Sequence, residues 1–109
     1  MKVNQDYTGT TLDALNEDVV VTVADADVVT FDVTGTFTGT LTLQVSVDGT
    51  TYVTTTGINV GSNSLVTTLT SAGVARLTNC QGFETARLRF TAYTSGSALV
   101  KWQTARTSK

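Results

Sequence analysis

Residues 41–49 read LTLQVSVDG, and this stretch decides the fold class of the chain. Apolar side chains stand at every second position: Leu41, Leu43, Val45 and Val47. Strict alternation predicts a half-buried β-strand, because successive side chains of a strand point to opposite faces of the sheet. Asp48-Gly49 is typical of a two-residue hairpin turn, in which both residues need positive φ. The resulting register pairs Val45 with Tyr52 and Leu43 with Thr54, so that Tyr52 joins the core face. Asp48 is therefore expected to form the turn, and the minor alternative is that it binds a calcium ion.

The same period continues on both sides of this stretch. Upstream, the inward positions are Val19, Val21, Val23, Val29, Phe31 and Val33. Downstream, Leu65, Thr67 and Leu69 indicate another strand, residues 71–73 a turn into a strand at 74–78, and residues 80–83 a loop with Gly82 as its hinge. About eight short strands follow one another at roughly the 8–12-residue spacing of antiparallel sandwiches. We therefore predict an all-β fold, an antiparallel β-sandwich of jelly-roll type over residues 18–109, preceded by an irregular N-terminal arm, residues 1–17.

Residues 85–103 are predicted to form the last hairpin of the sandwich. The inward positions would be Ala86, Leu88, Phe90, Ala92, Ala98, Val100 and Trp102. A three-residue loop at 94–96 pairs Phe90 with Val100 and gives Gly96 the positive φ that such loops require. A two-residue turn would instead set Phe90 opposite Lys101. A slip of one residue would expose the whole apolar set, so the three-residue loop is preferred.

This register gathers basic side chains on the outer face. It sets Arg89 directly opposite Lys101, with Arg87 one step along. Like charges directly opposite one another destabilise a sheet. We therefore expect acidic groups to face these three residues, either from the chain's own N-terminal half or from a neighbouring subunit. Arg87, Arg89, Lys101, the outward-facing Tyr93, and the acidic Asp6 and Asp13 of the arm are the candidate protein-interface residues.

Composition supports a β-protein and removes much chemistry. The chain has 24 Thr and 15 Val, both β-branched, and no Pro. It also has no His, and Cys80 is its single cysteine, so His-based catalysis, a Cys-rich metal centre and an internal disulfide are not expected. Asp25 and Asp27 fit a turn between strands better than a catalytic pair of carboxylates. No enzyme activity, cofactor or metal is expected.

Charge is divided unevenly along the chain. Residues 1–48 carry eight acids and one base, whereas residues 49–109 carry one acid and six bases. The basic half lacks the density of Lys and Arg that is typical of a nucleic-acid surface, so a nucleic-acid partner is not expected. No apolar run approaches the ~20 residues of a membrane span, and residues 1–6 do not resemble a signal peptide. Sugar binding is an alternative function, since the aromatic side chain of Tyr7, Tyr93 or an exposed Trp102 could stack on a sugar ring.

Two stretches resemble a known group of proteins. They are residues 33–52, VTGTFTGTLTLQVSVDGTTY, and residues 87–96, RLRFTAYTSG. Their succession resembles small β-sandwich proteins of tailed-phage virions, which include capsid decoration (cement) proteins and tail-associated modules. The resemblance covers about residues 19–103 and rests on strand and turn signatures.

This resemblance implies a structural function without catalytic residues. It implies a decoration protein that binds the major capsid protein or other virion proteins, assembles as a homotrimer and uses an extended arm for contacts. Such a protein would be part of the virion, assembled in the host bacterial cytoplasm. The alternative is a glycan-binding or connector module of a phage tail or head fibre.

Overall fold

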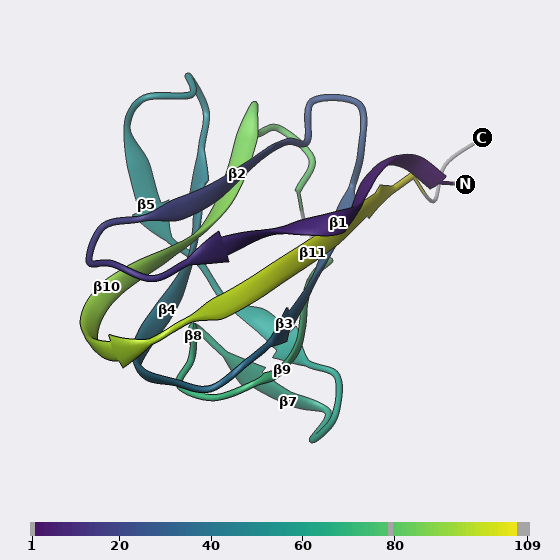
Figure 1. Ribbon diagram of the computed structural model, residues 1–109. Helices are drawn as coiled ribbons and strands as arrows, with labels where there is room; N and C mark the ends of the chain where they lie inside the picture. The colour runs from purple at the N-terminus through teal and green to yellow at the C-terminus, as the bar shows by residue number, and fades with distance from the viewer. Residues whose placement is uncertain (1, 79, 107–109) are drawn as a thin grey trace.

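The computed structural model describes residues 2–78 and 80–106, and these residues form two antiparallel β-sheets packed face to face. The strands are β1 (Lys2–Leu12), β2 (Asp18–Thr22), β3 (Val28–Thr34), β4 (Phe37–Ser46), β5 (Tyr52–Thr54), β6 (Gly57–Asn59), β7 (Ser64–Val66), β8 (Thr68–Leu69), β9 (Gly73–Leu77), β10 (Thr85–Gly96) and β11 (Ala98–Ala105). Sheet A has the order β1-β11-β3-β9-β6-β7, and sheet B has the order β2-β10-β4-β5, with β8 also pairing with β4. Figure 1 shows β1 and β11 lying side by side.

The strand order confirms the predicted jelly-roll sandwich. The short strands β5 and β8 both pair with β4, so they occupy one position at the edge of sheet B. With the β6–β7 hairpin set aside, the remaining eight positions are arranged 1-8-3-6 in sheet A and 2-7-4-5 in sheet B. This is the jelly-roll order. Consecutive positions lie in opposite sheets, except for positions 4 and 5, which are neighbours in sheet B.

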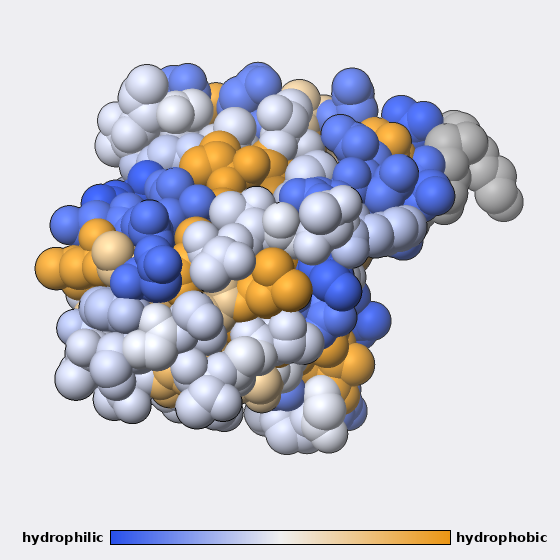
Figure 2. Space-filling model, viewed as in Figure 1, coloured by the Kyte–Doolittle hydropathy of each residue, from blue (hydrophilic) through white to orange (hydrophobic). Residues whose placement is uncertain are grey.

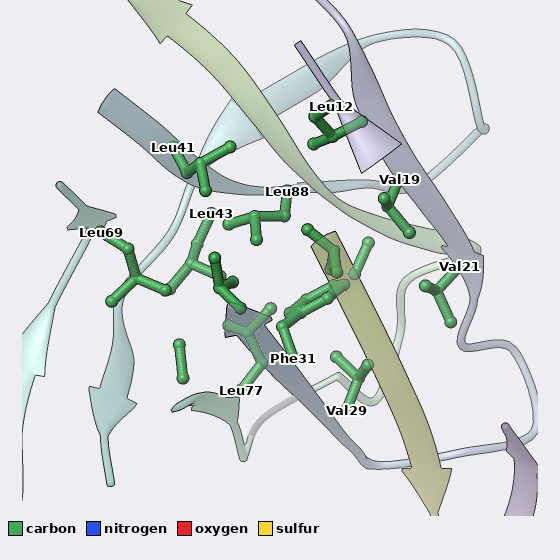
Figure 3. Packing of buried hydrophobic residues seen from close by; sticks show 14 of the residues in the cluster. Leu12, Val19, Val21, Val29, Phe31, Leu41, Leu43, Leu69, Leu77 and Leu88 are labelled. Carbon is green, nitrogen blue, oxygen red and sulfur yellow. The ribbon is translucent and has the colours of Figure 1, made fainter. Parts of the chain in front are cut away.

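The core lies between the sheets and is built from the alternating apolar residues (Figure 3). Phe31 of β3 and Phe90 of β10 are fully buried and come from opposite sheets. The predicted inward residues of β2 and β3 are all buried, as are Ala86 and Leu88 of β10. Trp102 is partly buried and packs against the core. Period-two alternation therefore identified most of the core correctly.

The predicted last hairpin is wrong. β10 pairs with β2 and β4, whereas β11 pairs with β1 and β3, so the two strands belong to different sheets. Phe90 and Val100 do both point into the core, but from facing sheets. The connection is a crossover between the sheets, and Gly96 at its start has the predicted positive φ, 89°. Arg89 is consequently not opposite Lys101, because the two residues lie on opposite outer faces of the sandwich.

The hairpin after β4 also differs from the prediction. Ser46 pairs with Tyr52 and Val45 with Val53, so the loop covers residues 47–51 instead of the two-residue Asp48-Gly49 turn. The Asp48 carboxylate explains the longer loop, because it accepts hydrogen bonds from the backbone N–H groups of Thr50 and Thr51, at 2.9 Å each. The shift of one residue turns Tyr52 to the outer face of sheet B.

The irregular conformation predicted for residues 1–17 is corrected for most of the segment. Lys2–Leu12 form β1, an edge strand of sheet A, and Leu12 is buried in the core.

Two positions that were predicted to face the core are exposed. Ala92 was predicted inward but is exposed, because the register of β10 shifts between Phe90 and Ala92. Val47 is 71% exposed because β4 ends at Ser46.

The strand predicted around residues 65–69 is divided between the two sheets. Leu65 lies in β7 of sheet A and is exposed, whereas Leu69 lies in β8 of sheet B and is buried. The predicted turn into β9 and the loop after Cys80 are present. The turn predicted at Asp25 and Asp27 lies between β2 and β3.

Candidate interaction surfaces

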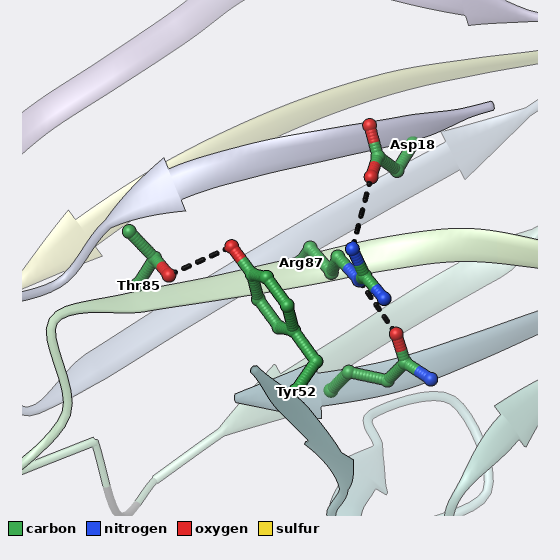
Figure 4. Close-up of polar contacts among 5 residues, drawn as sticks. Asp18, Tyr52, Thr85 and Arg87 are labelled. Carbon is green, nitrogen blue, oxygen red and sulfur yellow. Dashed lines mark hydrogen bonds and ion pairs between the residues drawn. The ribbon is translucent and has the colours of Figure 1, made fainter. Parts of the chain in front are cut away.

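The outer face of sheet B carries a polar cluster centred on Arg87 (Figure 4). Its Nε donates a hydrogen bond to Gln44 Oε1 at 2.6 Å, and its Nη1 donates to Asp18 Oδ2 at 3.5 Å. The guanidinium carbon lies 3.7 Å from the centre of the Tyr52 ring, and the Tyr52 hydroxyl is hydrogen-bonded to Thr85 Oγ1 at 2.8 Å. One side chain of β10 thus contacts β2, β4 and β5, which are all the other strands of the sheet B order.

The electrostatics of Arg87 reflect this crowded setting. Burial lowers the pKa of its guanidinium, and the nearby charge of Arg89 lowers it further, whereas Asp18 and Tyr52 oppose the shift. Only 14% of the Arg87 side chain is exposed, against 30% for Asp18. The expectation that Arg87 faces an acid from the N-terminal half of the chain is confirmed by this ion pair. Arg87 therefore has a structural role, in which its side chain links neighbouring strands of sheet B.

The outer face of sheet A carries an open hollow of about 290 Å³. It is lined by residues of three adjacent strands: Tyr7, Thr30, Asp32, Lys101, Trp102 and Gln103. Lys101 is directly across from Asp32 in the β11–β3 register, and within the described residues no ion pair joins them. An acceptor and a donor of opposite charge therefore face the same small space, next to an exposed aromatic ring.

A bulge in β1 places Tyr7 over this hollow. Asp6 pairs with Trp102 and Thr10 with Val100, so that residues 7–9 stand opposite the single residue Lys101. Asp6 Oδ1 accepts hydrogen bonds from the N–H groups of Thr8 and Gly9, at 3.1 and 3.0 Å. Gly9 has a φ of 94°, which few residues other than glycine adopt readily. The bulge is thus held by a side chain and by a glycine of the chain itself.

The structure distributes the six predicted interface residues over several places. Arg87 and Arg89 lie on the outer face of sheet B, and Lys101 lies on the outer face of sheet A. Tyr93 was predicted as a free surface aromatic, but its ring packs edge-on against Phe90 at 5.2 Å and its hydroxyl donates to the Gly96 carbonyl at 2.7 Å. Only Arg87 and Arg89 of the predicted basic group are therefore neighbours.

The two predicted acidic residues both have local structural roles. Asp6 holds the β1 bulge, and Asp13 lies in the loop before β2 beside Glu17. The Asp13 N–H donates to Glu17 Oε1 at 2.7 Å. A hydrogen bond with Glu17 and the charge of Glu17 raise the pKa of Asp13, whereas the bond from the Asp13 backbone lowers the pKa of Glu17.

Sequence reasoning missed both the Arg87 cluster and the hollow as assemblies. Gln44 and Asp18 sit at outward positions of their strands, but only the strand order shows that they flank Arg87 on either side. One local signal for the hollow was present in the sequence. An aspartate followed three residues later by a glycine, here Asp6 and Gly9, is typical of a bulge held by a side chain, and this bulge places Tyr7 over the hollow.

The visible surface supports polar contacts more than apolar ones. Figure 2 shows apolar spots separated by polar and neutral side chains over β1, β11 and β2. Within residues 2–78 and 80–106, no helix is long and apolar enough to cross a membrane. The same residues contain no group of three or more His, Cys, Asp or Glu side chains that would hold a metal ion.

These features define a small jelly-roll domain that presents fixed polar surfaces on both of its sheets. The crystal structure of SPBc2 prophage-derived protein YomS has the same fold, with a TM-score of 0.68. The match covers 94% of this chain and 96% of that chain, at 11% sequence identity. No family model matches the chain, and no curated protein matches it.

Proposed function

We propose that this protein is a structural component of a tailed-phage particle, namely a decoration protein bound to the outside of the capsid. The observation that carries the proposal is the match to a prophage-derived protein along nearly the whole length of both chains. The likeness therefore concerns the whole β-sandwich and not only a part of it. The resemblance of residues 33–52 and 87–96 to phage virion β-sandwich proteins points in the same direction.

A decoration protein acts by binding, and this fold is suited to it. Binding to the assembled capsid and not to its separated subunits stabilises the shell by mass action, without any reaction at an active site. The protein's part is to present fixed surfaces, and the two sheets and the Arg87 cluster hold those surfaces in place. In this proposal the partner is the major capsid protein, and the protein is not an enzyme.

Arg89 is the proposed charged contact on sheet B. It lies two residues from Arg87 on the same face, and among the described residues it takes part in no ion pair. Charges at the rim of an interface mainly steer association and are screened by salt. Attachment to the capsid should therefore weaken in about 0.5 M salt, where the screening length is only a few ångströms.

Assembly as a trimer is part of the same proposal. Three copies around a symmetry point of the capsid would each contribute the same surfaces. A specific interface between two copies is expected to bury at least about 1,000 Å².

The test uses purified particles of the phage that encodes this sequence. Quantitative mass spectrometry should find the protein in a copy number comparable to that of the major capsid protein. Particles that lack it should release their DNA at a lower temperature, and added protein should restore the wild-type temperature. Arg89→Glu should weaken the restoration, whereas Thr91→Ala on the same strand should not. Absence of the protein from purified particles, or unchanged heat resistance without it, would overturn the proposal.

A further inference from the structure

We infer that the hollow on the outer face of sheet A is a binding site for a neutral sugar ring, a pyranose. This inference goes beyond the proposed place on the capsid and does not depend on it. It rests on the presentation of Tyr7, on the polar groups around that ring and on their balance of charge.

The first observation is that the chain deviates from a regular strand at the point that presents Tyr7. Three residues of β1 stand opposite Lys101, and this bulge is held by Asp6 and by the positive φ of Gly9. A larger residue at position 9 would be strained by this φ of 94°, and its Cβ atom, 2.8 Å from Leu99 Cδ1, would require the Leu99 side chain to move. Bulges next to functional sites commonly re-aim a side chain, and here the side chain in the bulge is an aromatic ring.

The second observation is that the Tyr7 ring is both exposed and fixed. Tyr7 is 56% exposed, yet its hydroxyl donates a 2.6 Å hydrogen bond to Gln103 Oε1 of β11. The ring is thereby held at the hollow. A tyrosine ring supplies a flat apolar surface at little cost in side-chain entropy. The face of a pyranose that carries mainly C–H groups is a matching apolar surface.

The third observation is the set of hydrogen-bonding groups around the ring. The Asp32 carboxylate accepts, the Lys101 ammonium donates, and the Thr30 hydroxyl does both. All three line the hollow with Tyr7. Asp32 and Lys101 lie directly across from each other without an ion pair between them, so a hydroxyl group could bond to each. Ring hydroxyls of a sugar both donate and accept, which suits this mixed set.

The balance of charge selects a neutral ligand. Lys2 Nζ lies 5.7 Å from the centre of the Tyr7 ring, which adds a second cation to Lys101. Asp32 in the hollow and Asp6 in the bulge supply two anions. The four charges cancel, so the site gives little net attraction to an acidic sugar such as a sialic acid.

The test is an NMR titration of the whole protein labelled with 15N. The probes are the methyl glycosides of glucose, galactose, mannose and N-acetylglucosamine, with the methyl glycoside of sialic acid as the anionic probe. At least one neutral glycoside should shift the amide signals around Tyr7, Asp32 and Lys101. Tyr7→Ala should weaken that binding about tenfold or more, since it removes the stacking surface.

Leu65→Ala is the matched control, because Leu65 is also an exposed large side chain of sheet A but lies in β7, at the opposite edge of the sheet from β1, and should leave the affinity unchanged. Asp32→Asn tests the hollow separately if Tyr7→Ala disturbs β1, and it should also weaken binding. The inference is overturned if no neutral glycoside shifts these signals, if only the sialoside does, or if both variants bind like the wild type. A saccharide site would stand even if the protein proved absent from the capsid, so the two proposals fail independently.

Discussion

The guanidinium carbon of Arg87 lies 3.7 Å from the centre of the Tyr52 ring, and this contact joins β10 to the edge strand β5. The contact exists because the loop after β4 is longer than a two-residue turn, which places Tyr52 on the outer face. Together with the bonds to Gln44 and Asp18, it makes Arg87 the common partner of three other strands.

Replacing this arginine by lysine should destabilise the protein although the charge is kept. Lysine lacks the planar fork that stacks on Tyr52 while bonding to Gln44, so we expect Arg87→Lys to lower the free energy of unfolding by about 1–2 kcal/mol. Urea denaturation measures this change. Arg89→Lys on the same face should stay within about 0.5 kcal/mol. Equal stability of the two variants would show that the cluster contributes nothing.

Gly96 is a second position at which the structure makes a sharp prediction. Its φ is 89°, and a Cβ atom there would lie 2.3 Å from the Thr36 carbonyl oxygen. Gly96→Val should therefore lower the free energy of unfolding by more than the ~1–2 kcal/mol expected for a positive φ alone, or it should prevent folding.

Gly49→Val is the control for this effect. Gly49 also has a positive φ, 84°, but a Cβ atom there would meet nothing within 4 Å. Thermal denaturation of both variants separates backbone strain from steric clash. A Gly96→Val protein as stable as Gly49→Val would contradict the described crossover.

Asp48 should make stability depend on pH. Hydrogen bonds from the Thr51 and Thr50 N–H groups and from Ser46 hold the pKa of its carboxyl well below the ordinary value of about 3.9. A lowered folded-state pKa gives stabilisation that is present above the unfolded-state pKa and is lost as pH falls toward the folded-state pKa. The stability advantage of the wild type over Asp48→Asn should thus be full at pH 7 and shrink below about pH 4. An advantage that does not change over this range would argue against the loop bonds.

Cys80 should be inert in the folded protein. Its side chain is fully buried, and burial raises the pKa of the thiol to about 11, with a smaller contribution from the charge of Asp27. Since the thiolate is the reactive form, a disulfide reagent at pH 8 should label the native protein far more slowly than the urea-unfolded protein. Equal labelling rates would contradict the burial of this residue.

The period of the apolar residues predicted which side chains face the core, but not which strands are neighbours. Phe90 and Val100 point inward in the predicted hairpin and also in the observed crossover, so the pattern of the sequence is the same in both. Only pairing with distant strands separates the two arrangements. The sequence of residues 85–103 alone contains no information on that pairing.

The predicted register and the predicted inward positions are wrong where a side-chain hydrogen bond or a bulge changes the regular strand pairing. The carboxylate of Asp48 lengthened its loop and turned Tyr52 outward, and a shift in β10 exposed Ala92. The residue type of Tyr7 is sufficient to suggest sugar binding, but it does not show which side chains surround the ring. The position of Tyr7 beside Asp32 and Lys101 depends on the β1 bulge and on the pairing of β1 with β11. That pairing could not be predicted, because residues 1–17 have no clear alternation and were expected to form an irregular arm.

The most direct test of the central claim is a cryo-EM reconstruction of the phage particle that encodes this sequence. The account predicts density for the jelly roll on the outer surface of the capsid, in groups of three around symmetry points and in contact with the major capsid protein. Density for this domain in the neck or tail, or a capsid surface without it, would contradict the proposed function.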